Sequence, residues 1–163
     1  MRFLRDEKKD GLFVDINPLL AEVIRQIPTA ADPEDNEAAG GRLFPAPGPA
    51  NSEMTADWRE YVKPGLAEQF EEARSLVEKD LEDGFEQKEG GESFRLRVPL
   101  AHTDAWLNGL NQARLVLAAK HDFSDGELTD ELPPELTCQR EFALYQIAIY
   151  GWMQELLLTT MEE

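Results

Sequence analysis

The longest apolar stretch of the chain lies near the C-terminus, in residues 141–158, where only Gln146 interrupts the apolar run before Gln154 and Glu155. A helix that is apolar on nearly all sides is typical of a buried element that the rest of a domain covers. The run is too short for a membrane span, which takes roughly 20 apolar residues. The pattern therefore predicts a core helix, in which Gly151 lets a neighbouring helix approach closely.

Two other segments, residues 12–16 and 94–98, alternate apolar and polar side chains with the period of a half-buried strand. We expect them to pair in a small N-terminal antiparallel sheet of two to three strands, with Arg95 and Arg97 facing solvent. Apolar residues at helical spacing predict further helices, which cover residues 18–27, 57–62, 64–83 and 100–121. Together these elements predict a mainly α (α+β) fold, a bundle of four to five helices around the buried C-terminal helix.

Residues 28–56 differ from the rest of the chain, because they hold five of its ten prolines, three glycines and an acidic patch. Such a composition is typical of a long surface loop. We therefore expect one domain, residues 1–163, that contains a mobile Pro/Gly-rich loop at 28–56. The sequence leaves open whether this loop is functional or an insertion.

Charge narrows the classes of partner. The chain has 16 basic and 33 acidic residues, a net charge of −17 and a pI near 4.4. Such a surface repels nucleic-acid phosphates and anionic lipids, so we expect neither a nucleic acid nor a membrane as partner. The acidity favours solubility, with a surface for a basic protein partner as the alternative. The N-terminus lacks an apolar signal segment, which favours a cytoplasmic protein, and the single cysteine, Cys138, is expected to be a small core residue.

Arg114 is the most informative polar residue, because it recurs at helical spacing with the apolar residues Trp106, Leu110 and Leu117. A buried guanidinium needs a partner. One interpretation pairs Arg114 with Glu155 or Glu141 across a helix interface, with Asn111 and Gln154 completing the network. The alternative is a pocket in which Arg114 binds a carboxylate or phosphate. On the first interpretation Arg114→Ala lowers the melting temperature strongly, whereas wild-type-like stability would favour the pocket.

No catalytic, cofactor or metal motif stands out. His102 and His121 are 19 residues apart on one predicted helix, hence about 100° apart around its axis, and cannot ligate one ion together. The stretch 121–132 matches a calcium-binding loop at only one position. The carboxylates fall on polar helix faces and loops rather than within the apolar stripes, so we predict no catalytic site, no cofactor and no metal.

The run DAWLNGLNQARLVLAAKH, followed by an acidic loop and then YQIAIYGWMQELLL, resembles a bacterial family catalogued as domain of unknown function 2017. The resemblance covers most of the chain and is clearest over residues 94–158; it departs from the family pattern at 99–102 and in 28–56. It implies a small, mostly helical fold and supplies no activity. Family members tend to be encoded near the Clp protease adaptor, which implies a link to regulated proteolysis. Matching positions are Trp106, Leu107, Leu110, Asn111, Arg114, Leu115, Tyr145, Trp152, Gln154 and Glu155.

From these positions we take one candidate polar cluster, formed by Asn111, Arg114, Tyr145, Trp152, Gln154 and Glu155. The leading hypothesis is a non-catalytic cytoplasmic interaction or regulatory protein with a protein partner, linked to Clp-type proteolysis. The alternative is a small-molecule or anion-binding protein, conceivably an enzyme, with a pocket at Arg114. The first predicts co-purification with a partner and no defined pocket; the second predicts a concave site containing Arg114. A homodimer through Trp58, Tyr61 or residues 156–158 stays open.

Overall fold

The computed structural model describes residues 2–162, and its first strands belong to a four-stranded antiparallel sheet. The strand order is β1-β2-β4-β3. The two central strands pair antiparallel as expected, with Leu12 opposite Val98 and Ile16 opposite Phe94. The sheet has one strand more than expected, because Phe85 in the polar connection packs on the core and pairs opposite Leu96. The strands are β1 (Leu4–Asp6), β2 (Gly11–Ile16), β3 (Phe85–Gln87) and β4 (Phe94–Pro99).

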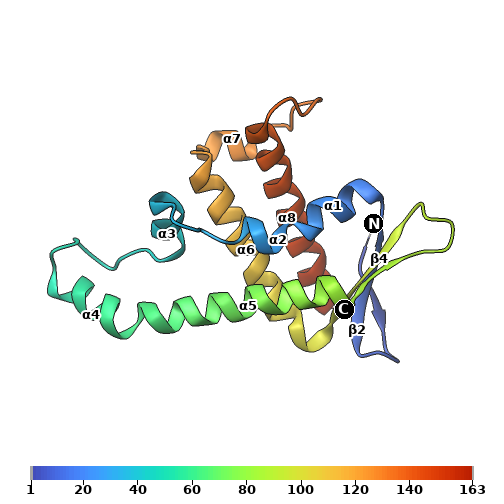
Figure 1. The fold of residues 1–163 in the computed structure, drawn as a ribbon, viewed down its shortest axis with the longest axis horizontal. Helices are drawn as coiled ribbons and strands as arrows, with labels where there is room; N and C mark the ends of the chain where they lie inside the picture. The colour runs from blue at the N-terminus through green and yellow to red at the C-terminus, as the bar shows by residue number, and fades with distance from the viewer. Residues whose placement is uncertain (1, 163) are drawn as a thin grey trace.

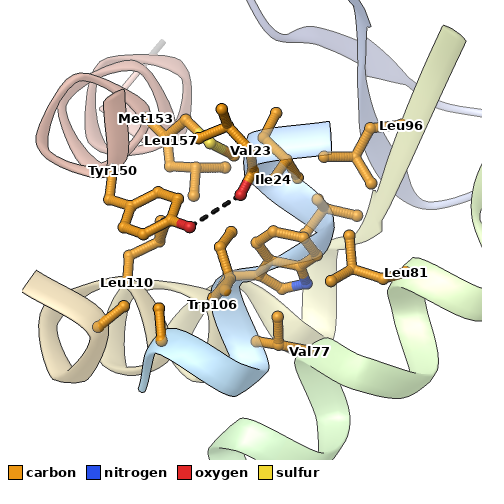
Figure 2. Close-up of a cluster of buried hydrophobic side chains, with 14 of the residues drawn as sticks. Val23, Ile24, Val77, Leu81, Leu96, Trp106, Leu110, Tyr150, Met153 and Leu157 are labelled. Carbon is orange, nitrogen blue, oxygen red and sulfur yellow. Dashed lines mark hydrogen bonds between the residues drawn. The ribbon is translucent and has the colours of Figure 1, made fainter. Parts of the chain in front are cut away.

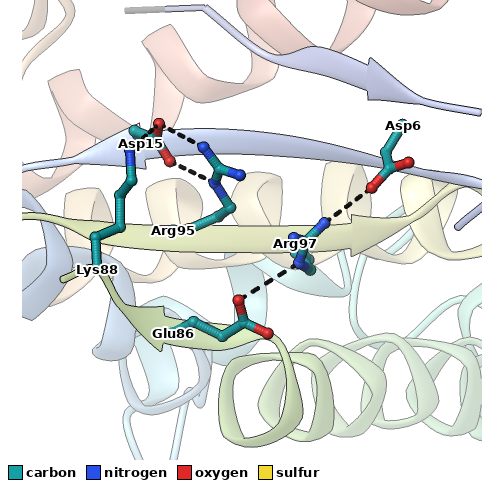
Figure 3. A network of polar contacts seen from close by, with 6 residues as sticks. All are labelled: Asp6, Asp15, Glu86, Lys88, Arg95 and Arg97. Carbon is teal, nitrogen blue, oxygen red and sulfur yellow. Dashed lines mark hydrogen bonds and ion pairs between the residues drawn. The ribbon is translucent and has the colours of Figure 1, made fainter.

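One face of the sheet carries ion pairs, whereas the other face packs on the core (Figure 3). Asp15 accepts from Arg95 Nε at 2.7 Å and from Lys88 Nζ at 2.9 Å. The hydrogen bond from Arg95 holds the pKa of Asp15 well below its usual range. Arg97 donates to Asp6 at 3.0 Å. The two strand arginines are therefore on the outward face, as the alternation predicts.

Helices form the rest of the domain (Figure 1). The sheet lies at the C-terminal end of the long helix α5, α4 lies at its other end, and α6 and α8 run beside each other. The first helix begins as predicted, because the Asn17 side chain accepts a hydrogen bond from the amide of Leu20. The helices are α1 (Pro18–Arg25), α2 (Ile27–Ala30), α3 (Glu37–Leu43), α4 (Glu53–Tyr61), α5 (Lys63–Asp83), the 3₁₀ helix η1 (Leu100–His102), α6 (Thr103–Lys120), α7 (Asp125–Thr129) and α8 (Gln139–Glu162).

The main core lies where α1, α5, α6, α8 and the sheet meet (Figure 2). Trp106 is fully buried beside Val77 and Leu81 of α5. Tyr150 is also fully buried, and its hydroxyl donates to the carbonyl of Val23 at 2.8 Å. Burial raises the pKa of Tyr150, so its hydroxyl stays protonated and continues to donate. The mainly α fold with a buried C-terminal helix is confirmed.

Helix α8 is buried along one stripe rather than equally on all sides. The residues of this stripe are Ala143, Gln146, Ile147, Tyr150, Met153 and Leu157. Apolar residues on its flanks, such as Leu144 and Trp152, stay partly exposed. Helix α6 contacts α2, α3, α5 and α8 and so is surrounded on more sides than α8. The partly exposed flank of α8 is available for a further contact.

Residues 28–56 do not form one continuous loop, and that prediction is wrong. Helix α3 forms within the segment because Asn36 caps its first turn and its residues Ala39 and Leu43 bury against Val116 of α6. Helix α4 also begins earlier than predicted. The N-cap is Ser52, whose hydroxyl accepts from the amide of Thr55 inside the helix.

The connection between α6 and α8 contains α7, whose N-terminus has a capping box formed by Ser124 and Glu127. Cys138 comes at the end of this connection and is exposed, so the expectation of a core cysteine is wrong. It precedes the first turn of α8, where its carbonyl accepts from the amide of Phe142. Among residues 2–162, no helix has the length and hydropathy needed to cross a bilayer.

Candidate functional site

Arg114 joins α6 to α8 through an amide rather than a carboxylate. Its Nη1 donates to Gln154 Oε1 at 2.7 Å, and Gln154 Nε2 donates to the carbonyl of Leu107 at 3.1 Å. The expected ion pair with Glu155 or Glu141 is not among the ion pairs of residues 2–162. Glu141 instead accepts from the amide of Thr137 at 2.7 Å at the start of α8. The guanidinium charge is therefore not neutralised by an adjacent carboxylate within the described chain.

Gly151 explains how the guanidinium fits against α8. A Cβ atom at this position would lie 3.2 Å from Cζ and 3.3 Å from Nε of Arg114, which is tighter than an ordinary van der Waals contact. The close approach predicted at this glycine thus occurs, and the approaching group is an arginine side chain from α6. Arg114 Nε is buried and has no hydrogen-bond partner within residues 2–162. An unsatisfied buried donor costs about 1–3 kcal/mol, so this contact stabilises the helix pair less than a fully hydrogen-bonded arginine would; Arg97 Nε is in the same situation on the sheet.

A concave surface surrounds this arginine, and we name it the α6–α8 groove. It encloses about 280 Å³ between α6, α8 and the connection around α7. Most of its lining is apolar, with Arg114 in the wall and two carboxylates, Asp130 and Glu155, beside it. The apolar lining residues are Leu128, Leu132, Leu144, Ile147, Ala148 and Trp152.

The structure brings together only part of the candidate polar cluster. Arg114, Trp152 and Glu155 line the groove, and Gln154 holds Arg114 in place. Asn111 is exposed on α6 and does not line the groove. Tyr145 is half-buried and packs against the edge of the main core instead. The groove also includes Leu128 and Leu132, which the sequence did not single out, because nothing local indicates that the acidic connection folds back on α8.

A second polar cluster, formed by Asp80, His102 and Trp106, lies on the α5 side of α6. Asp80 is 6% exposed, which is rare for a carboxylate. It accepts from the indole Nε1 of Trp106 at 2.9 Å and contacts His102 Nδ1 at 2.9 Å. These two partners compensate for the burial of the carboxylate.

The Asp80 pocket opens beside this cluster, between the C-terminal end of α5, the sheet and η1. It has a volume of about 350 Å³. Its charged lining residues are Asp6, Lys9, Lys79, Asp80, Asp83, Arg97 and His102, and the remainder of the wall is Gly11, Leu12, Gly84, Val98 and Pro99. The pocket thus combines an oriented histidine with several cationic groups.

Sequence reasoning missed Asp80, because it placed every carboxylate outside the apolar stripes. Asp80 follows Val77 by three residues and Ala73 by seven, so it lies within the predicted stripe of α5, and this spacing was the available signal. His102 was considered only as a metal ligand together with His121. Its partner is instead a carboxylate 22 residues earlier in the chain.

Comparison with known protein families matches residues 5–161 to the family described as domain of unknown function (DUF2017). The chain belongs to the DUF2017 family. The match includes α5, α6 and α8, and therefore every residue of both polar clusters. Searches of curated proteins and of solved structures gave no significant match.

The two surfaces of the DUF2017 fold differ in what they can bind. The α6–α8 groove offers apolar area with one guanidinium, which suits an apolar side chain of a protein segment. The Asp80 pocket offers lysines and an oriented imidazole, which suit a small polar ligand. Within residues 2–162, no three His, Cys, Asp or Glu side chains are grouped so that they could hold a metal ion.

Proposed function

We propose that this DUF2017 chain is a non-catalytic interaction protein of the cytoplasm, which binds a segment of a partner protein in the α6–α8 groove. The observation that supports the proposal is the apolar lining of this groove on the partly exposed flank of α8. Apolar surface that remains open to solvent in concave form often marks a protein-binding site. The groove has room for an apolar side chain, and such anchors dominate the binding energy of protein interfaces.

Exposed leucines extend the apolar surface beyond the groove. Leu128, Leu132 and Leu136 are each between 36% and 42% exposed; Leu128 lies on α7, and the other two lie on the connection between α7 and α8. These three leucines are partly exposed, so the protein lacks the stabilising free energy that their complete burial would give. A partner that covers this connection would recover part of that energy.

Charge and hydrogen-bonding capacity define the partner segment further. Asp130 and Glu155 lie at the groove, and the whole chain has a charge of −17. A segment with a basic residue next to its apolar anchor therefore matches the groove electrostatically. Within residues 2–162 only Nη1 of Arg114 has a protein partner, and Nε is buried, so Nη2 is the nitrogen that can donate to a main-chain carbonyl of the segment.

The family resemblance implies a link with Clp-type proteolysis, so a protein of that proteolytic system is one class of partner for this groove. A second function, the binding of a small anion at Arg114, has two supporting observations. One is the concave site around Arg114, which this alternative predicts, and the other is the absence of a carboxylate paired with this guanidinium in the described chain. The two acidic groups of the groove weaken that reading, because both repel an anion.

The test compares two surface variants as bait for partners in the native cell lysate. Leu132→Asp places a charge in the groove, whereas Leu19→Asp changes a leucine of α1 that is 59% exposed and does not line the groove. We expect wild type and Leu19→Asp to recover the same partner and Leu132→Asp to recover about tenfold less, by quantitative mass spectrometry. Equal recovery by the two variants, or no partner at all, would contradict the proposal.

Two further measurements separate the alternatives. Titration with inorganic phosphate tests the anion reading, which predicts saturable binding that is lost in Arg114→Gln. Light scattering tests whether the occupant is a second copy of this chain, in which case wild type is a dimer and Leu132→Asp is a monomer. Either result would replace the proposed partner protein with the occupant that it identifies.

A further inference from the structure

The Asp80 pocket carries a second inference, which does not depend on the groove. We infer that this pocket binds a small molecule bearing a carboxylate or phosphate on a compact apolar body, and that His102 Nε2 contacts its oxyanion.

The pocket has an unusual charge balance for so acidic a protein. Three cationic side chains, Lys9, Lys79 and Arg97, face three carboxylates, so the lining is neutral before His102 is counted. Arg97 is already paired with Asp6 at 3.0 Å. Lys9 and Lys79 form no ion pair within residues 2–162. An anion that enters the pocket therefore meets two unpaired lysine charges against one unpaired carboxylate, that of Asp83, in a chain that elsewhere repels it.

The orientation of His102 is fixed by the buried carboxylate. An ionised Asp80 can only accept hydrogen bonds, so the nitrogen that faces it, Nδ1, carries a proton. The indole of Trp106 holds Asp80 from the other side. The ring nitrogen that remains for a ligand is Nε2. A carboxylate behind a histidine is the arrangement that orients imidazoles for ligand binding in many sites.

Access and shape agree with a small ligand. The His102 side chain is 30% exposed, whereas that of Asp80 is 7% exposed, so the imidazole is the accessible member of the pair. Leu12, Val98 and Pro99 form apolar wall. A volume of about 350 Å³ lies near the lower end of the range for small-molecule sites, which is roughly 300–1,000 Å³. A hydrogen bond between Nε2 and the acid group of a ligand needs one proton, which either the imidazole or the ligand supplies, while Nδ1–H continues to donate to Asp80.

The first experiment titrates the full chain with inorganic phosphate, and in parallel with succinate, while amide and indole signals are followed by NMR at constant ionic strength. The indole N–H of Trp106 is the reporter, because it is bonded to Asp80. We expect saturable shifts at this signal and at Lys9. Lys9→Gln should weaken binding about three- to fivefold, the effect of one exposed charge. Lys8→Gln, on the same turn but outside the pocket, should change nothing.

The second experiment separates the two nitrogens of His102. His102→Asn places an amide nitrogen near the position of Nδ1, so it keeps a donor for Asp80 and removes Nε2. This variant should melt near the wild-type temperature and bind phosphate about tenfold more weakly. His102→Gln reaches toward the position of Nε2 instead, and should retain more of the binding.

Three results would overturn the inference. The shifts fail to saturate or appear equally with chloride, Lys9→Gln and Lys8→Gln titrate alike, or His102→Asn binds as wild type does. Saturable binding of phosphate alone assigns the oxyanion to a phosphate group, and binding of succinate alone assigns it to a carboxylate. Loss of partner binding in Leu132→Asp leaves all of these titrations unchanged, so the two proposals fail separately.

Discussion

Helix α6 takes part in two polar clusters, which differ in how completely a charged side chain is hydrogen-bonded. Asp80 is almost completely buried and receives two nitrogen partners, from His102 and Trp106. Arg114 receives one amide oxygen, from Gln154, and lies partly open in a groove. A carboxylate can be satisfied by two or three donors, whereas a guanidinium has five N–H groups. The comparison indicates that the Asp80 carboxylate is satisfied by its two protein partners, which leaves only Nε2 of His102 in that cluster for a ligand, whereas the Arg114 guanidinium itself has unused donors.

The largest expected effect on stability is at the Asp80 cluster. Asp80→Ala leaves a buried indole N–H and the imidazole without their acceptor, so it should lower the free energy of unfolding by about 3 kcal/mol. The control is Asp83→Ala, which removes an exposed carboxylate from the same helix and should have little effect. Urea unfolding measures both. Equal losses of stability from the two substitutions would show that the buried hydrogen bonds of Asp80 do not contribute more than an exposed carboxylate.

A smaller effect on stability is expected at the Arg114 cluster. Arg114→Ala removes one hydrogen bond and the packing of the arginine stem, and should cost about 1 kcal/mol, or roughly 2–4 °C in melting temperature. This is less than a purely structural, ion-paired arginine would give. Differential scanning calorimetry beside Arg42→Ala, an exposed arginine of α3, measures the difference. A loss as large as that of Asp80→Ala would show that the guanidinium is needed for folding.

The smallest effect on stability is expected at an exposed ion pair on the sheet. Asp15 and Arg95 form a bidentate contact on the sheet, where Asp15 is still 36% exposed, so Asp15→Asn should cost less than about 1 kcal/mol near neutral pH. The depressed pKa of Asp15 makes this contribution complete above the unfolded-state pKa, which is about 4, and lost as the pH falls below it.

Urea unfolding of wild type and Asp15→Asn at about pH 7 and about pH 3 tests that sign. The difference between the two proteins should shrink at the lower pH. A difference that is constant or grows on acidification would mean that the lowered pKa does not arise from native-state contacts.

Elements with strong local patterns were predictable. The apolar run of α8, the stripe of α5 and the alternation of β2 and β4 each carry their own periodicity, and all four formed in nearly the expected places. The elements that were missed depend on distant partners. Helix α3 contains Gly40 and Gly41 and is stabilised by burial against Val116, and β3 exists because β4 offers an edge for it. Neither partner can be read from the local sequence.

The candidate sites follow the same rule. Arg114 was found because its position in an apolar stripe is conspicuous, but its partner was misassigned, since Gln154 and Glu155 are neighbours on α8 and only the rotation of that helix decides between them. Asp80 has the same kind of signal on α5. Its partners lie 22 and 26 residues later, on the far side of two strands, so no local pattern links them.

The missing side chain of Gly151 has a consequence for whatever enters the groove. Because the flat guanidinium rests directly on the main chain of α8, the depth of the recess is determined by the absence of one methyl group. A partner side chain in the groove would therefore contact the helix backbone and the guanidinium at one point. Ordinary helix surfaces do not offer this combination, because their own side chains cover the backbone.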